Sequence, residues 1–396
     1  MDVKLNTSSA ATINLPLHGG HAPPYLIKRM TKLSYSISKV IIDEYGQHEF
    51  LRRLSDPLWF QAFGCVLGFD WHSSGVTTVV TGVLKQSLKE ETHAISIAGG
   101  KGKKAIQTKS DIATIAERYY NLSSSQIEHL LYSSRMAAKV DNAALQDSYS
   151  LYHHVILFDE HGKWTIIQQG MNPNSKMARR YHWNSDNLKC FVSEPHTGII
   201  SDCKNQNTLN MTSIDSIDNQ KISVELANGD TNNLKSSVYK VGRLIRNIRE
   251  KKNTLDTWIM QENNNNNTRD LQYGEHYEMP RRLDWEAFRR TYDIQPHNYE
   301  QLISIPGIGS AAVRALSLIG EIIFGTKASW QDPVKFSFAH GGKDGVPYPV
   351  VRKTYDNSIR YLSSAIEGAE IEREERSRAL HKLAQFSARL FNRDKS

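Results

Sequence analysis

Apolar residues near the start of the chain recur at helical spacing. After Pro23-Pro24, a pair that suits a first helical turn, large apolar side chains follow every three or four residues from Leu26 to Ile41. Gly46 is predicted to end this helix, and Gln47–Leu54 is predicted to form a second helical stretch. Asp56-Pro57 predicts the start of a third, strongly apolar helix. The chain is therefore predicted to open with helices.

Alternating apolar and polar residues follow, mixed with further helical segments. The segment Asp159–Lys163 separates two alternating runs and is typical of a hairpin turn. Thr77–Leu84 fits a strand or a helix equally well. Ser110 is a good N-cap residue. The predicted strands are His93–Ala98, His154–Phe158, Trp164–Gln168 and Cys190–Val192, and the predicted helices are Ser110–Tyr119 and Gln126–Ala138.

The composition changes after about residue 201. Asp202–Asn233 is polar and is predicted to be an exposed excursion with one hairpin at Lys221–Leu226, and the run Asn263–Asn267 predicts a linker. Helical spacing returns from Arg281 onward. The predicted fold class is an α+β N-terminal domain followed by an all-α helix-hairpin-helix module. The predicted organisation is a disordered leader (1–14), an α+β catalytic domain (15–200), a polar insertion (201–235), a basic amphipathic helix (236–252), an Asn-rich linker (253–280) and a helical DNA-binding module (281–396) with the helix-hairpin-helix at 299–320.

The composition indicates a soluble protein with anionic partners. The chain has 396 residues, enough for two or three domains, with 39% hydrophobic and 23% charged residues. No run approaches the length of a membrane helix. The three cysteines form no CxxC pair, so a disulfide framework is not expected and the predicted compartment is the cytoplasm. The net charge is +7 and the pI is about 9.1.

One segment near the C-terminal third matches the helix-hairpin-helix pattern. In Leu302–Ile319, Pro306 ends the first helix, Gly307 and Gly309 permit a tight turn, and Ile308 is expected to anchor the turn in the core. The backbone N–H groups that begin the second helix form a natural phosphate site. The alternative is a structural turn without a ligand. The residues expected to bind nucleic acid here are Gly307, Ile308, Gly309, Ser310, Ala311 and Arg314.

The positive charge gathers just before the linker. Lys235–Lys252 carries seven basic residues against one acidic residue, Glu250. Within it, Val238–Arg249 is predicted to be an amphipathic helix whose one-signed face tracks phosphates, although a solvated helix face is the alternative. The basic residues expected to contact nucleic acid are Lys240, Arg243, Arg246 and Arg249, joined by Lys101, Arg179 and Arg180 elsewhere in the chain.

Several polar clusters in the N-terminal part could carry chemistry. Gly68–Gly75 joins Asp70 and His72 in a glycine-bounded loop, and His18-Gly-Gly-His21 forms a second cluster. Gly99–Lys104 is similar to a phosphate cradle but lacks P-loop spacing, so no nucleotide is expected as a cofactor. For any single residue, a cap, a turn or a buried hydrogen-bond bracket is the competing interpretation.

The fourth cluster, which includes Lys139–Asp147, Tyr152–His154 and Gln168, is the richest and predicts one polar cleft. Its acidic, amide and imidazole groups stand at the ends of apolar runs, where they could hold a divalent metal such as Mg or Mn beside a base that activates water. The order of its secondary-structure elements is broadly similar to that of restriction-type nucleases. Those enzymes need a lysine two residues after the acidic or amide metal ligand, and that lysine is absent here. The candidate catalytic residues, expected to converge, are Asp70, His72, Asp141, Asp147, His153, His154 and Gln168.

Long strings throughout the chain resemble the domain-of-unknown-function 763 family of archaea and bacteria. They include His18–Pro24, Phe50–Gly75, Ala98–Gly102, Lys139–Asp147 and Tyr152–His154, continuing with Gln168–Met171, Ala178–Trp183 and Ser337–Gly345. The resemblance covers Leu15–Leu390 and brings no established activity. It implies that the N-terminal domain and the hairpin module occur together, and it leaves out Lys204–Asn233 and the Asn run, which look like insertions.

Three functions are compatible with these features. The leading expectation is a protein that processes or repairs DNA, favoured over RNA, as a metal-dependent nuclease. The second is a helix-hairpin-helix DNA glycosylase, with Asp332 as the catalytic carboxylate and Trp330 stacked on a flipped base. The third is a DNA-binding recruitment factor without activity of its own. The oligomeric state and the preferred DNA structure do not follow from the sequence.

Overall fold

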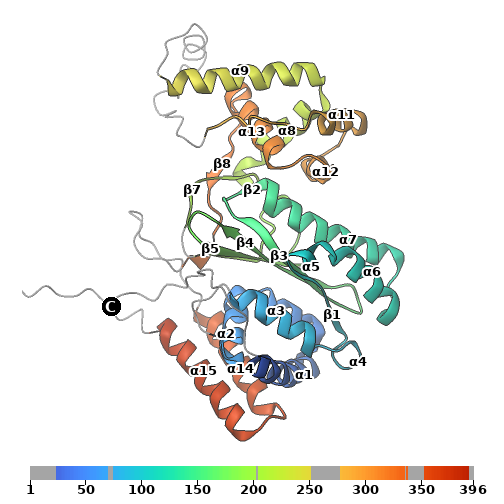
Figure 1. The fold of residues 1–396 in the computed structure, drawn as a ribbon, viewed down its shortest axis with the longest axis vertical. Helices are drawn as coiled ribbons and strands as arrows, with labels where there is room; N and C mark the ends of the chain where they lie inside the picture. Colours follow the sequence, from blue (N-terminus) through green and yellow to red (C-terminus); the bar gives the residue numbers. More distant parts are fainter. Residues whose placement is uncertain are drawn as a thin grey trace, which may run out of the picture.

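The structure is a computed structural model in which a sheet separates two groups of helices, with a further helical module at one end (Figure 1). It describes residues 24–69, 75–201, 204–250, 277–334, 336–337 and 352–391. None of the helices in these ranges is long and apolar enough to cross a membrane. The mixed α/β class expected for the N-terminal part is confirmed.

The central sheet has six strands in the order β1-β3-β4-β5-β6-β9. All neighbours are antiparallel except β6 and β9. The predicted hairpin is confirmed: the carboxylate of Asp159 accepts the backbone N–H groups of His161 and Lys163 in the turn between β3 and β4. The predicted strand at Cys190–Val192 is wrong, because that segment forms turns. The bounds are β1 Ile95–Lys101, β3 Ser150–Asp159, β4 Trp164–Asn172, β5 Met177–Asn184, β6 Gly198–Ser201 and β9 Phe336–Ser337.

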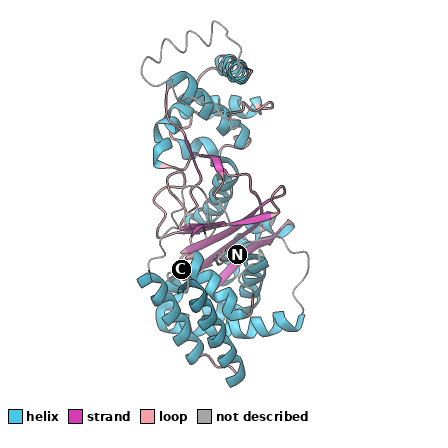
Figure 2. Cartoon of the chain, turned by 90° about the vertical axis from the view of Figure 1, so that its left-hand side faces the viewer, coloured by secondary structure: helices cyan, strands magenta, loops and turns pink. Residues whose placement is uncertain are grey.

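One face of this sheet is covered by helices from both ends of the chain (Figure 1), and Figure 2 shows the helices packed below the strands. The two C-terminal helices were expected in the DNA-binding module, and that expectation is wrong: Leu362, Ile366 and Phe386 share a core with the first helices. The predicted break at Gly46 is confirmed: its backbone is not helical, with φ of 83°, and it forms a kink between the two helical stretches of α1. The bounds are α1 Pro24–Leu54, α2 Pro57–Leu67, α3 Gly75–Ser87, α4 Glu90–His93, α14 Arg352–Gly368 and α15 Arg373–Phe391.

The opposite face is covered by helices from the middle of the chain. The helix predicted at Gln126–Ala138 is confirmed, and a capping box between Ser123 and Gln126 holds its first turn. It runs directly into a π-helical turn, η1, that carries the buried Asp141. The bounds are α5 Lys103–Ile106, α6 Thr108–Tyr119, α7 Ser124–Lys139 and η1 Val140–Ala144.

The helical module stands on a small second sheet with the strand order β2-β7-β8. The hairpin predicted at Lys221–Leu226 is wrong, because this segment lies in helix α8, whose buried Asn219 and Gln220 donate to backbone carbonyls of other segments. One side of this polar stretch is thus packed into the module, while its other side is exposed. The bounds are β2 Leu145–Gln146, β7 Gln206–Asn210, η2 Ile214–Ser216, α8 Ile217–Asn228, α9 Thr231–Arg249, α11 Trp285–Ile294, α12 Tyr299–Ser304, α13 Ser310–Phe324 and β8 Ser329–Gln331.

A buried ion cluster joins the module to the central sheet. Arg179 on β5 donates to Asp147 at 2.9 Å and to both carboxylate oxygens of Asp332 at 3.0 and 2.7 Å. Asp147 follows β2 and Asp332 follows β8, so one guanidinium group ties the two outer strands of the small sheet to β5. The side chain of Arg179 has no exposed surface. Its charge is therefore neutralised entirely inside the protein.

Replacing Arg179 with methionine leaves two buried carboxylates without their counter-charge. We expect the free energy of unfolding, measured with denaturant, to fall by about 3–5 kcal/mol. The triple variant Arg179→Met, Asp147→Asn, Asp332→Asn removes all three charges and is expected to recover part of this decrease. Arg289→Met breaks an exposed pair with Glu286 and serves as the control. Unchanged stability of Arg179→Met would show that the cluster does not hold the module in place.

Candidate functional site

A buried chain of hydrogen bonds runs across one face of the central sheet. His154 on β3 is the register partner of Gln168 on β4, and its Nδ1 lies 2.8 Å from the Gln168 amide oxygen. The Gln168 amide nitrogen donates to Asp141 at 2.6 Å, and Nε2 of His154 lies 2.8 Å from the hydroxyl of Ser134. Three of the predicted residues, Asp141, His154 and Gln168, therefore do converge, and Ser134 joins them from helix α7.

The carboxylate of Asp141 determines which group donates and which accepts in every hydrogen bond of this series. It also accepts from Trp183 at 3.0 Å and contacts His196 at 2.5 Å. Because Asp141 accepts the Gln168 amide N–H, the Gln168 oxygen faces His154 and requires a proton on Nδ1. Nε2 is then unprotonated and accepts the hydroxyl proton of Ser134. Burial lowers the pKa of His154, so the ring is neutral at neutral pH.

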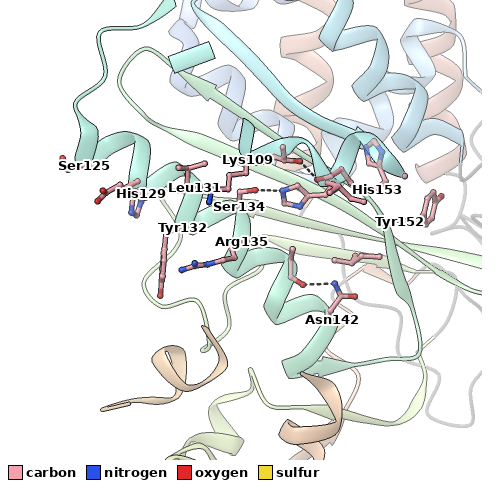
Figure 3. A pocket seen from close by; sticks show the side chains of 18 residues that line it. Lys109, Ser125, His129, Leu131, Tyr132, Ser134, Arg135, Asn142, Tyr152 and His153 are labelled. Carbon is pink, nitrogen blue, oxygen red and sulfur yellow. Dashed lines mark hydrogen bonds between the residues drawn. The ribbon is translucent and has the colours of Figure 1, made fainter. Parts of the chain in front are cut away.

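The Ser134–His154 end of this hydrogen-bonded chain lies at a large hollow of the described surface. The hollow has a volume of about 1100 Å³ and lies between helices α5, α6 and α7 and strand β3 (Figure 3). Arg135, His129 and Tyr132 lie along its α7 side. Ser134 was not singled out in the sequence, because a serine within a helix has no motif around it.

Asp147 belongs to a second buried cluster on the same face. Its carboxylate accepts from Arg179 at 2.9 Å and from the hydroxyl of Tyr181 at 2.6 Å. The expectation that Arg179 faces solvent and attracts phosphate is therefore wrong. Asp332, proposed as a glycosylase carboxylate, is bound to Arg179 instead, and the indole N–H of Trp330 donates to Glu321 at 3.1 Å.

His153 and Arg180 lie on the other face of the sheet. Successive side chains of a strand point to opposite faces, so neighbours such as His153 and His154 separate. His153 contacts the hydroxyl of Thr81 on helix α3 at 3.0 Å. Arg180 is fully buried, donating to Gln61 at 3.1 Å and to the ring of His182 at 2.8 Å, so its predicted contact with phosphate is also wrong. A single cleft holding all the candidates is therefore not formed.

The predicted metal site has no set of ligands in the part of the chain that is described. No group of three or more His, Cys, Asp or Glu side chains there could hold a metal ion. Asp141 and Asp147 instead accept hydrogen bonds from protein donors. Asp70 and His72, together with the His18–His21 cluster, lie outside the described residues.

The segment predicted as a helix-hairpin-helix forms two helices joined by a tight turn. Gly307 has φ of 91°, and an added Cβ there would lie 2.6 Å from the Cβ of Ala287 on α11, so only glycine fits. Ile308 is fully buried, as predicted. Gly309 is the N-cap of α13 and provides no side chain to satisfy the first N–H groups, while Ser310 is exposed and Ala311 partly so.

The turn is also fastened to the central domain. The amide of Gln146 donates to the carbonyl of Ser310 at 2.8 Å and accepts from Arg314 at 2.8 Å. Lys139 donates to the carbonyl of Ile305 at 3.2 Å. Arg314, expected to bind nucleic acid, therefore helps to fix the start of α13 beside β2.

The basic helix is confirmed and begins earlier than predicted, at Thr231. Val241, Leu244 and Ile245 are buried against the module. Lys240, Arg243 and Arg246 are exposed, and the side chain of Arg249 lies outside the described set. The helix is therefore amphipathic in the sense expected from its sequence.

Buried neutral histidines make the stability of the fold depend on pH. Burial, with smaller effects from His154 and Lys101, lowers the pKa of His153 to about 3. The unfolded chain takes up this proton below about pH 6.5 and the folded chain does not, so stability present above that pH decreases on acidification. His153→Gln is expected to reduce the dependence of unfolding free energy on pH by about 1.4 kcal/mol per unit between pH 6 and 4. The exposed His129→Gln is the control, and equal slopes in all three proteins would refute this account.

Comparison with known proteins gives a family without a function. No curated protein and no solved structure matches the chain. Residues 11–350 match the model of a family described as "Protein of unknown function (DUF763)". Since this match covers most of the 396 residues, the chain belongs to the DUF763 family.

Proposed function

We propose that this protein binds the phosphate backbone of nucleic acid, DNA rather than RNA, through a helix-hairpin-helix formed by α12, the Gly307–Gly309 turn and α13. The observation that carries the proposal is the uncapped N-terminus of α13, whose first residue, Ser310, is exposed. Unpaired N–H groups and the positive end of the helix dipole favour an anion there. The guanidinium group of Arg290 donates to the carbonyl of Pro306 at 2.9 Å beside the turn and is paired with the carboxylate of Asp284 at 3.8 Å.

Helix α9 supplies a second basic surface on the same module. Its buried side packs with α13 in one core, while Lys240, Arg243 and Arg246 point outward. Figure 1 places α9 at the outer end of the molecule and α12 toward the central sheet, so the two surfaces are separate and are tested separately. Contacts of this kind recognise phosphates and carry no base sequence information.

Processing of the bound DNA is the second part of the proposal. Metal-dependent cleavage remains our leading candidate activity, and recruitment of other proteins to DNA needs only the binding surfaces described above. A glycosylase that uses Asp332 is not proposed, because Arg179 holds both oxygens of that carboxylate. Incubating the protein with labelled single-stranded, duplex, forked and nicked DNA, with and without Mg²⁺ or Mn²⁺, distinguishes cleavage from binding alone.

The proposed helix-hairpin-helix is tested best by substitutions of Gly309. An added Cβ there has no atom within 4 Å, and its φ of −109° suits any residue. Gly309→Asp places a carboxylate that caps α13, so we expect unchanged or higher thermal stability together with weaker binding to every DNA sequence. Gly309→Ala leaves the N–H groups open and is the control. Equal DNA affinity of the Asp and Ala variants would refute the role of the hairpin.

The basic helix is tested through the salt dependence of binding. Removing one cation that contacts a phosphate is expected to reduce the slope of log affinity against log salt by about one unit. The double variant Arg243→Gln, Arg246→Gln is therefore expected to bind more weakly and with a flatter slope. Arg378→Gln, Lys382→Gln removes the same charge from α15, at the other end of the molecule. If the two double variants behave alike, only net charge matters and α9 is not a contact surface.

A further inference from the structure

A second, smaller pocket lies on the opposite side of the central sheet from the hydrogen-bonded pair Ser134–His154. It has a volume of about 430 Å³ and is formed by helix α3, the end of strand β1 and the start of α5. Three lysines and one histidine are its only residues of a titratable kind. The pocket is lined by Thr78, Thr81, Gly82, Lys85, Gln86, Gly99, Gly100, Lys101, Lys104, His153 and Val155.

The lysines leave this pocket with uncompensated positive charge. Lys85 is paired with Asp111 at 3.1 Å and donates to the carbonyl of Gly99 at 3.0 Å, so it mainly holds the loop. Lys101 and Lys104 are exposed, and neither has a carboxylate partner within the described ranges. An added Cβ at Gly100 would lie 3.0 Å from the Cβ of Lys104, so glycine lets the stem of Lys104 rest on the strand.

The backbone of this loop does not form a phosphate cradle. The N–H of Gly99 donates to Asp111 at 3.1 Å, and that of Gly102 donates to the carbonyl of Tyr152 at 2.8 Å. These amides are therefore used within the protein, which agrees with the absence of P-loop spacing in the sequence. Any anion here is bound by side chains.

The imidazole of His153, which lines both this pocket and the larger hollow, holds one buried hydrogen-bond acceptor without a partner. The hydroxyl of Thr81 donates to the carbonyl of Thr77 at 2.7 Å, so the 3.0 Å contact with His153 requires a proton on Nε2. Nδ1 of the neutral ring then carries a lone pair, and it has no hydrogen-bond partner. A buried acceptor without a partner is costly, so a ligand that brings a donor is favoured.

We propose that this pocket binds a phosphate group that still carries a hydroxyl, either inorganic phosphate or a phosphomonoester. Lys101 and Lys104 neutralise its charge, and the P–OH donates to His153. A phosphomonoester has its second pKa near 6 and retains the protonated form near neutral pH. Sulfate and the phosphodiesters of a nucleic acid backbone have no such proton at this pH. The pocket is therefore suited to the terminal phosphate of a strand or nucleotide, and it does not depend on the proposed hairpin.

The test compares phosphate with sulfate, two ligands of equal shape of which only phosphate carries a hydroxyl proton near neutral pH. Isothermal titration with inorganic phosphate and with sulfate at pH 6.5 is expected to show binding of phosphate and at least tenfold weaker binding of sulfate. Lys101→Gln and Lys104→Gln are each expected to weaken phosphate binding about tenfold or more, since a charged hydrogen bond contributes about 1.5–3 kcal/mol. Lys103→Gln changes a neighbouring exposed lysine that does not line the pocket and is expected to have no effect.

Oligonucleotides identify the source of the phosphate. A short strand with a 5′-phosphate, the same strand without it and the free mononucleotide are titrated in competition with inorganic phosphate. Displacement by the phosphorylated strand or by the mononucleotide supports the site and tells which is bound. Absence of phosphate binding, equal affinity for sulfate, or unchanged affinity in both lysine variants overturns it. Gly309→Asp should keep this phosphate affinity, so failure of the hairpin proposal is recognised independently.

Discussion

The arrangement of the domains depends on the burial of one charge. The guanidinium of Arg179 lies inside the protein, where a charge without polar partners would be strongly unfavourable, and two carboxylates bind it. Those carboxylates belong to segments far apart in the chain, Asp147 after β2 and Asp332 after β8. Satisfying Arg179 therefore brings the small sheet, and the helical module that stands on it, against strand β5. Gln146, next to Asp147, in turn holds the start of α13.

The alternation of the central strands divides the polar residues into two sets. Side chains of one set form the chain from Asp141 through Gln168 and His154 to Ser134, beneath the larger hollow. Those of the other set include His153, which faces α3 and the smaller pocket with its lysines. The two hollows nevertheless share His153, which lines both of them at the edge of the sheet. The two faces are best regarded as distinct candidates for chemistry and for phosphate recognition.

The proposed surfaces recognise phosphate in different forms. The start of α13 offers backbone N–H groups and the exposed face of α9 carries basic side chains, both of which suit phosphodiesters. The pocket beside β1 combines Lys101 and Lys104 with an acceptor, which suits a phosphate that retains a proton. A protein with both would hold the body of a strand and distinguish its end. This division accounts for a glycine-lysine loop that does not form a P-loop.

Local sequence alone determined several elements of this protein, while the packing of distant segments was decided only by the tertiary structure. The β3–β4 hairpin, the capping box before α7 and the α12–α13 turn follow from residues a few positions apart. Helix α8 was missed because Asn219 and Gln220 look solvent-exposed until their distant carbonyl partners are known. The placement of α14 and α15 against α1 and α2, and the burial of Arg179 and Arg180, were missed for the same reason. The chemistry of a polar side chain determines which hydrogen bonds it can form. Its partners, however, lie elsewhere in the chain, and only the folded structure brings them together.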